Sequence, residues 1–359
     1  MLPTATDRVA STTPEAASVF LTAARATPSE EAVALAHKHF GASGSFAPLA
    51  SERDQNFHIS AQSGQEFILK IANPAEDPAV TDLQTQILLH IAKVEPLLPV
   101  QRMVQTKSGA YQVRAALADG TVRTVRLVTC LPGLALHKSS PSRLQRENLG
   151  RALAQLDLSL KGFNHAAAQR QLLWHLSEAL NVRDRLIYVS DSETRELAAQ
   201  SLENFEQIAA PVLDALPQQV IHCDFNPHNV LADSSNRNRI SGILDFGDAL
   251  SAPRINDVAI AASYHLTSEH DPLAKAAEVV RGYHSHSPID EKEFEILPVL
   301  MGARVAMTVA ITSWRAELYP ENRDYILRNA PSARAGLRAL ARHSLSRSRE
   351  ILIMACSDV

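Results

Sequence analysis

Two short polar loops hold the residues of this chain that are best suited to chemistry. In the first, Asp224 stands five residues before Asn229, and in the second Asp245 follows the apolar stretch 242–244. A hydroxyl nucleophile needs a carboxylate that orients it and accepts its proton, whereas nucleotide phosphates need Mg²⁺ held by hard oxygen ligands. Asp224 suits the first role, and Asn229 with Asp245 suits the second. The pattern indicates phosphoryl transfer to a hydroxyl group.

Asp and Asn are also common in ordinary turns, which is the plainer interpretation of each loop by itself. Two such loops, each beside an apolar run typical of a buried strand, favour the catalytic interpretation. His222, in the first loop, is expected to brace it by hydrogen bonding, because a neutral imidazole both donates and accepts.

With these motifs the chain resembles the aminoglycoside phosphotransferase and choline kinase family of small-molecule kinases, which are distantly similar to protein kinases. The chain further resembles one branch of this family, the hydroxylysine kinases, in segments 51–57, 125–133, 242–248 and 319–322. The resemblance runs from about residue 30 to about residue 330. It implies a two-lobed, protein-kinase-like α+β fold, with a small antiparallel-sheet N-lobe, a larger helical C-lobe and a nucleotide in the cleft between them.

Composition agrees with a globular enzyme. The chain has 359 residues, 45% of them hydrophobic, and a formal net charge of −4, which suits two lobes and argues against a nucleic-acid partner. The cysteines Cys130, Cys223 and Cys356 lack metal-type spacing, so a reducing cytoplasm is expected. No apolar run approaches the ~20 residues of a membrane helix. A small-molecule substrate is the expected partner, and the oligomeric state stays open.

Periodicity divides the chain into three parts. Residues 1–28 are expected to be a flexible tail, with an organelle transit peptide as the alternative. Residues 29–130 should form the nucleotide-binding N-lobe, with helices at 30–40 and 79–93, strands at 55–60, 65–71, 98–104, 111–118 and 121–129, and a hairpin turn at Asp119-Gly120. Residues 131–359 should form the helical C-lobe, with helices at 143–161, 169–190, 193–216, 255–266, 272–284, 291–318 and 332–353.

The nucleotide-binding residues follow from the resemblance. Lys70 alternates out of an apolar strand, and the resemblance implies that it contacts the α- and β-phosphates. Its usual carboxylate partner is in doubt, because Gln84 aligns with that position and Asp82, the nearest acid, lies about 200° away on the helix.

The loop 50–56 has no glycine, so polar side chains would supply donors to phosphate; the candidates are Arg53, Gln55 and Asn56. Val128 and Cys130 should lie in the hinge that meets the base through backbone groups. Hydroxylysine kinases are associated with GTP, so GTP and ATP are both candidate co-substrates.

On the acceptor side, Asp248 is a candidate Mg²⁺ ligand or amine-binding carboxylate, and Asp257 is expected to be structural. Trp314 and Glu317 are candidate substrate contacts, although a core helix explains Trp314 as well. The expected acceptor is 5-hydroxylysine or a similar amino alcohol. Aminoglycosides, ethanolamine and choline are alternatives, choline being disfavoured by few aromatic residues for a cage. A protein kinase would need a longer activation segment, and a pseudokinase scaffold is the non-enzymatic alternative.

Overall fold

The computed structural model describes residues 27–49, 51, 53–267 and 270–359. Most of the predicted tail, 1–28, lies outside the described residues. The chain forms two compact units: one extends to Leu131 and includes Gln171–Leu173, and the other comprises Pro132–Arg170 and Trp174–Val359. The predicted division at 130/131 did not anticipate that Gln171–Leu173 would join the first unit.

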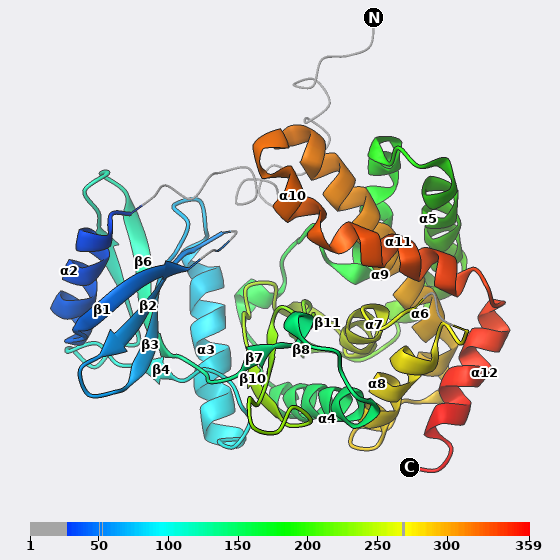
Figure 1. The fold of residues 1–359 in the computed structure, drawn as a ribbon, viewed down its shortest axis with the longest axis horizontal. Coiled ribbons are helices and arrows are strands. Elements are labelled where there is room, and N and C mark those ends of the chain that lie inside the picture. Colours follow the sequence, from blue (N-terminus) through cyan, green and yellow to red (C-terminus); the bar gives the residue numbers. More distant parts are fainter. Residues whose placement is uncertain (1–26, 50, 52, 268–269) are drawn as a thin grey trace, which may run out of the picture. The chain divides into compact units, whose positions relative to one another are not determined.

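The first unit is an antiparallel sheet with one helix on each face (Figure 1). The strands pair in the order β1-β2-β3-β6-β4, and β5 pairs with β6. The elements are α2 (Ser29–Phe40), β1 (Gly44–Leu49), β2 (Gln55–Ala61), β3 (Glu66–Ile71), α3 (Pro78–Val94), β4 (Met103–Val104), β5 (Gln112–Ala116) and β6 (Val122–Thr129). Two of these differ from expectation: β1 was not predicted, and only two residues of 98–104 form a strand.

Both differences have local causes. β1 contains Pro48 and lies at the sheet edge, where a residue without an N–H is tolerated. In the 98–104 segment, Arg102 donates to the carbonyl oxygens of Pro96 and Leu98 at 2.6 and 2.8 Å, which closes a loop before β4 begins. The predicted turn at Asp119-Gly120 is confirmed, because Leu117 N–H donates to Thr121 O across it.

Alternation along the strands separates an apolar face from a polar one. The apolar side chains are buried against α2; they include Phe57, Ile59, Leu69, Ile71, Val125 and Leu127. Lys70 therefore points to the other face, as predicted, and its register partners are Asn56 on β2 and Arg126 on β6.

The second unit is mainly helical. Its helices are η2 (Leu136–Lys138), α4 (Arg143–Leu160), η3 (Ala166–Ala168), η4 (Leu176–Tyr188), α5 (Ser192–Asn204), η5 (Phe205–Ala209), α6 (Ala210–Leu213), α7 (Ile255–Ser263), α8 (Ala274–His284), α9 (Glu291–Leu318), η6 (Pro320–Asn322), α10 (Arg323–Ile326), η7 (Leu327–Asn329), α11 (Ala330–Leu340) and α12 (Leu345–Cys356). Short antiparallel pairs carry the polar loops: β11 (Leu250–Pro253) pairs with β8 (Gln218–Ile221), and β9 (Val230–Ala232) pairs with β10 (Ile240–Ile243) and β7 (Leu134–Ala135).

Three predicted helices are interrupted. Residues 169–175 are not helical; Arg170 instead donates to the carbonyl oxygens of Gly247 and Ala249. In 193–216 a π-turn separates α5 from α6, next to Pro211, which has no N–H for an α-helical bond. In 332–353 the chain breaks after α11, and Ser344 caps a new helix by accepting from Arg347 N–H.

Helix α9 is long and apolar enough to cross a membrane by length and composition alone. The expectation that no segment reaches this level was therefore wrong. However, 94% of its most apolar segment is buried inside the protein, as in a core helix. The helix supplies core contacts to η4, α5, α7 and α11.

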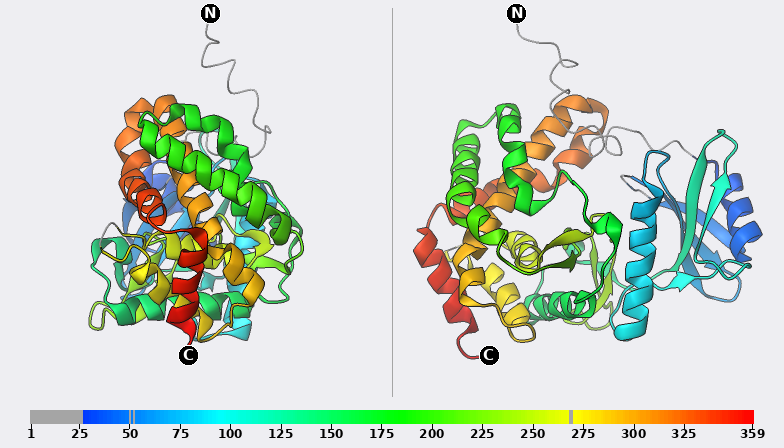
Figure 2. Two further views of the ribbon diagram at one scale, coloured as in Figure 1. Left: turned by 90° about the vertical axis from the view of Figure 1, so that its right-hand side faces the viewer. Right: turned by 180° about the vertical axis from the view of Figure 1, so that it is seen from behind.

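Helices α4 and α8 lie side by side in both Figure 1 and Figure 2. A glycine from each helix makes this approach possible, since a Cβ on Gly150 would overlap Val279 O and a Cβ on Gly282 would overlap Glu147 O. Backbone atoms cannot rotate away as side chains do, so the helices would have to separate.

We expect Gly150→Ala to lower the free energy of unfolding by about 1–3 kcal/mol, the typical cost of overpacking a core contact. Gly302→Ala in α9 is the matched control, because its Cβ would meet Ser201 Oγ at 3.4 Å, an ordinary contact. Helix propensity should make that variant neutral or more stable by about 0.5–1 kcal/mol. Urea denaturation of both variants tests the prediction, and equal stabilities would contradict it.

Candidate active site

The loop after β8 is held by a buried carboxylate. Asp257, in the first turn of α7, accepts the N–H groups of His222 and Cys223, both at 2.7 Å. Burial raises the pKa of Asp257, and the two N–H donors and the nearby His222 oppose that rise. The predicted structural role of Asp257 is confirmed.

His222 joins the two polar loops. Its Nδ1 accepts the N–H of Asp224 at 3.2 Å, so its Nε2 carries the proton and donates to Leu244 O at 2.9 Å. The ring also packs against Phe246, with the ring centroids 5.0 Å apart. The predicted bracing role is confirmed.

Both polar loops contain a residue in the left-handed backbone region. Cys223 has φ 64° and Asp245 has φ 62°, and they are the only non-glycine residues with positive φ in the described part of the chain. Such conformations cost energy and persist where the surrounding structure imposes them, most often at functional sites. One strained residue, Cys223, directly precedes Asp224. The other, Asp245, is itself a predicted metal ligand.

Asp224 is held through both carboxylate oxygens. Asn229 Nδ2 donates to Oδ2 at 2.8 Å and also to the backbone oxygen of Asp224 at 3.0 Å. On the other side, Arg304 Nη2 lies 3.2 Å from Oδ1. The side chain remains 25% exposed, so a substrate hydroxyl can reach it.

The surroundings raise the pKa of Asp224 to about 6. Burial is the largest cause, and the charge of Asp248 adds to it, whereas Arg304 opposes both. A carboxylate with a pKa near 6 is a better proton acceptor than an ordinary aspartate and is still ionised at neutral pH. The electrostatics therefore suit a general base.

The predicted metal ligands are brought together by the β9–β10 pair. Asn229 immediately precedes β9, and its backbone oxygen accepts Leu244 N–H at 2.8 Å, next to Asp245. Because the amide nitrogen of Asn229 is bonded to Asp224, its Oδ1 is the atom that can turn to a cation. An amide oxygen and a carboxylate are hard donors, so the residues fit Mg²⁺. Asp248 is buried beside Asp224, consistent with its effect on the pKa of Asp224.

In the first unit, Lys70 and Asn56 lie opposite each other on neighbouring strands. Within the described residues Lys70 forms no ion pair, and the two residues considered as its partner are engaged elsewhere. Gln84 Oε1 accepts from Arg126 Nη2 at 3.0 Å, and Asp82 Oδ1 accepts from Gln112 Nε2 at 3.1 Å. Arg126, not Lys70, thus connects the sheet to α3.

The loop before β2 is anchored by its neighbours. Asp54 lies 3.5 Å from Arg126 Nη2 and accepts Asn73 N–H at 3.3 Å, while Arg53 O accepts Asn73 Nδ2 at 3.2 Å. Gln55 exchanges two hydrogen bonds with the backbone of Thr27, at 2.5 and 3.0 Å. Its predicted phosphate contact would require breaking these bonds, whereas Asn56 already shares a sheet face with Lys70.

The predicted hinge is partly occupied by sheet contacts. Val128 pairs with Ile68 on one side and Met103 on the other, and Cys130 N–H donates to Glu66 O at 2.9 Å. A base that meets Cys130 would therefore have to use a different backbone group, such as its carbonyl oxygen.

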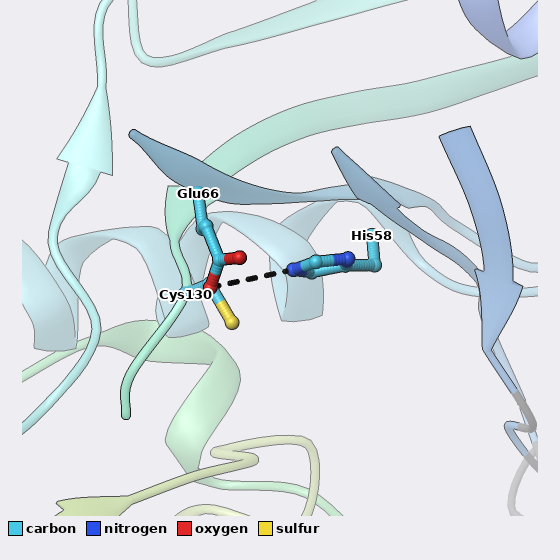
Figure 3. A group of neighbouring side chains, drawn as sticks. All are labelled: His58, Glu66 and Cys130. Atoms are coloured by element: carbon cyan, nitrogen blue, oxygen red, sulfur yellow. Dashed lines mark ion pairs between the residues drawn. The ribbon is translucent and has the colours of Figure 1, made fainter. Parts of the chain in front are cut away.

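Figure 3 shows three side chains that converge beside this hinge, His58 from β2, Glu66 from β3 and Cys130. His58 Nε2 and Glu66 Oε2 are 3.7 Å apart, and one donor atom from each of the three residues lies within 4.8 Å of the others. Burial and the Glu66 charge raise the pKa of Cys130, which favours the neutral thiol over the thiolate that metals bind. By strand alternation His58 and Glu66 share the face of Lys70.

The structure does not bring Trp314 and Glu317 to Asp224. Along α9, Trp314 is ten residues from Arg304, a rise of about 15 Å. Its ring instead packs under Arg185, 4.7 Å from the ring centroid. Glu317 is 60% exposed and pairs with Arg323 at 3.5 Å. The core-helix interpretation of Trp314 describes its contacts better than substrate binding does.

Sequence reasoning missed Arg304, which contacts Asp224, and Trp174 and Tyr264, which contact Arg304. Arg304 lies with its guanidinium over the Trp174 ring, 5.0 Å from the centroid, and its Nη2 is 3.4 Å from Tyr264 Oη. One signal was present in the sequence. Arg304 stands in an otherwise apolar stretch of α9, and an arginine there needs a buried acidic partner.

Comparison with known proteins identifies the family. The model of the phosphotransferase enzyme family matches residues 45–295. This chain belongs to that family. Hydroxylysine kinase of Danio rerio is 30% identical over 309 residues, covering 82% of this chain and 85% of the relative. Homoserine kinase of Azorhizobium caulinodans is 28% identical over 260 residues, covering 69% and 73%.

Two solved structures share the fold. The microcompartment-associated aminopropanol kinase aligns with a TM-score of 0.61 at 19% identity, covering 87% of this chain and 96% of the other. Amicoumacin kinase, in complex with AMP-PNP, Ca²⁺ and amicoumacin, aligns with a TM-score of 0.62 at 14% identity, covering 84% and 91%. The predicted kinase-like α+β fold is confirmed. The protein is a small-molecule phosphotransferase that acts on a hydroxyl group.

The raised pKa of Asp224, about 6, predicts a loss of activity in mild acid. Because only the ionised group accepts a proton, kcat/KM for the nucleotide should fall about tenfold per pH unit below roughly 6. The effect on stability has the opposite sign. The folded state binds this proton more tightly than the unfolded chain, so the contribution of Asp224 to stability decreases as pH rises from about 4 to about 6.

A pH–rate profile of kcat/KM, with unfolding curves measured at each pH, tests both the loss of activity in acid and the opposite change in stability. The curves show whether the enzyme is still folded where the rate declines. An acid limb centred near pH 4, the range of an ordinary aspartate, would contradict the assigned environment.

Proposed function

We propose that the protein transfers the γ-phosphoryl group of a nucleoside triphosphate, GTP or ATP, to the hydroxyl of 5-hydroxylysine or a closely similar hydroxy amino acid or amino alcohol. The single observation that carries the proposal is the environment of Asp224, an ionisable and partly exposed carboxylate held at both oxygens beside hard-oxygen ligands. In this scheme Asp224 orients the acceptor hydroxyl and takes its proton.

Asn229 and Asp245 would hold Mg²⁺. When bound, the ion neutralises charge on the phosphates and fixes their orientation. Lys70, with Asn56 on the same sheet face, would contact phosphate oxygens. Arg53, Gln55, Val128 and Cys130 stay predicted nucleotide contacts, and Gln55 would first have to release Thr27.

The acceptor is inferred from relatives and charge. The similar proteins include hydroxylysine kinases over about four-fifths of this chain, and a homoserine kinase over a shorter part. Asp248 supplies a carboxylate near Asp224 that would attract an acceptor amine. Choline is disfavoured, because Arg304 already lies over one face of the Trp174 ring, which leaves less aromatic surface for a quaternary ammonium.

Substitution of the two aspartates should separate chemistry from metal binding. Asp224→Asn keeps the size of the side chain but removes the proton acceptor, so turnover should fall by about 10²–10⁴ with nucleotide affinity nearly unchanged. Asp245→Ala should instead weaken Mg²⁺-dependent nucleotide binding. Titration of Mg²⁺-nucleotide by calorimetry and single-turnover rates measure the two effects. An Asp224→Asn variant with more than about a third of the wild-type rate would exclude the base assignment.

The acceptor is tested by nucleoside diphosphate release with GTP and ATP against hydroxylysine, homoserine, ethanolamine, choline and kanamycin. We expect kcat/KM to be at least about tenfold higher for hydroxylysine than for choline or kanamycin, a gap of about 1.4 kcal/mol that one charge pair can supply. The reverse ranking would remove hydroxylysine and leave only the general kinase assignment. No turnover with any acceptor despite Mg²⁺-nucleotide binding would favour a pseudokinase.

A further inference from the structure

Arg304 is a buried cation in direct contact with the proposed base. It lies on α9 and is 2% exposed, and its Nη2 is 3.2 Å from Asp224 Oδ1. Asn229 holds the other oxygen from the opposite side. A carboxylate bonded at both oxygens by groups from separate elements cannot rotate about its terminal bond. The direction in which it meets an acceptor hydroxyl is therefore set by these two partners.

Arg304 is itself fixed in place. The face of Trp174 lies against the guanidinium, and Tyr264 Oη accepts from the same Nη2 at 3.4 Å. This cation–π contact and the hydrogen bond to Tyr264 restrain the guanidinium. The position of Asp224 Oδ1 is thus set by α9 and by the residue just after α7, as well as by its own loop.

Arg304 makes fewer hydrogen bonds than we expect of a buried arginine whose only role is to stabilise the fold. Its Nε and Nη1 are buried and have no hydrogen-bond partner among the described residues. Unpaired buried donors and a desolvated charge both cost stability, and apolar residues of similar size are often at least as stabilising as a buried ion pair. A contact that is costly for folding and made to the reactive carboxylate points to a role in the reaction.

A direct contact with the acceptor's own carboxylate is the main alternative. The two unpaired nitrogens are covered by protein atoms, so an acceptor would reach them only after a rearrangement. The one nitrogen with partners faces Asp224 and Tyr264. The contacts favour action through Asp224.

We propose that Arg304 is a positioning residue for phosphoryl transfer, which orients the Asp224 carboxylate toward the acceptor hydroxyl without contacting the nucleotide. The proposal rests on the proposed function of Asp224 as the base. It assigns to α9, the central helix of the second unit, a part in the geometry of the reaction.

The test is a double-mutant cycle with Arg304→Met and Asp224→Asn, measured with whichever acceptor the wild-type enzyme uses best. We expect Arg304→Met to lower kcat by about 10²-fold, within the range of base contributions, with the KM for nucleotide changed less than about threefold. Arg304→Lys, which keeps one cationic contact, should recover at least about tenfold of that loss. In the Asp224→Asn background, Arg304→Met should cost little more, because the group on which it acts is gone.

Arg146→Met is the matched control for loss of a buried arginine. Arg146 is also largely buried and pairs with Glu278 at 2.5 Å on α8, so its loss should reduce stability without changing kcat of the folded enzyme. Thermal unfolding of each variant separates the two effects.

Three results would overturn the proposal: full additivity in the cycle, an Arg304→Met variant with more than about a third of the wild-type kcat, or a loss confined to one class of acceptor. For the last, hydroxylysine is compared with the diamine that remains when its carboxylate is removed. A loss seen only with the carboxylated acceptor would make Arg304 its docking group. If Asp224→Asn alone leaves the rate unchanged, the function proposed for Asp224 fails instead.

Discussion

Two hydrogen bonds to one buried carboxylate determine how the reactive loop leaves its strand. Asp257 accepts the consecutive N–H groups of His222 and Cys223, and consecutive amides can point to one acceptor only if the backbone turns sharply. Cys223 accordingly adopts φ 64°, a conformation that costs energy for any residue with a side chain. With the loop set this way, His222 reaches Leu244 and joins the two polar loops, while Asp224 and Asn229 are hydrogen-bonded within the first.

The balance of charge around Asp224 explains how one partly buried carboxylate can be reactive. Burial and Asp248 raise the pKa of Asp224, which strengthens it as a proton acceptor. Arg304 opposes the same rise, which keeps the pKa of Asp224 below neutral pH. The opposing cation, Arg304, belongs to α9, a helix whose other buried residues are mostly apolar. Reactivity therefore depends on a residue 80 positions away in the sequence.

In the sheet of the first unit, too, an arginine determines how the charged residues are paired. Arg126, buried on the Lys70 face, takes the contact to α3 that a lysine–carboxylate pair makes in many kinases, and Gln84 replaces the acid. Arg126 also lies against Asp54, so one cation connects the helix, the sheet and the loop before β2. This arrangement leaves the charge of Lys70 uncompensated within the described residues, which suits a group that is to meet phosphate.

Much of the fold and the centre of the site follow from the sequence alone, because they depend on local patterns. Period-two alternation predicted β2, β3, β5 and β6 and the direction of Lys70, and the spacing of Asp224, Asn229 and Asp245 predicted loops that the β9–β10 pair does bring together. The turn at Asp119-Gly120 follows from the conformations its residues prefer, and α2 begins after Pro28, whose fixed φ suits a helix start.

Only the tertiary structure decided which distant residues meet. Helical spacing assigns Arg304 and Trp314 to α9, but the packing of that helix decides that Arg304 meets Asp224 while Trp314 lies under Arg185. Likewise, the sequence predicts that Gln55 donates to phosphate, whereas in the fold its side chain is hydrogen-bonded to the backbone of Thr27. The breaks at 169–175 and 205–209 also escape periodicity, since an apolar pattern continues through them while Arg170 and Pro211 act on backbone bonding. Contacts between residues far apart in sequence carry no periodic signal, and a single chain determines them only by folding.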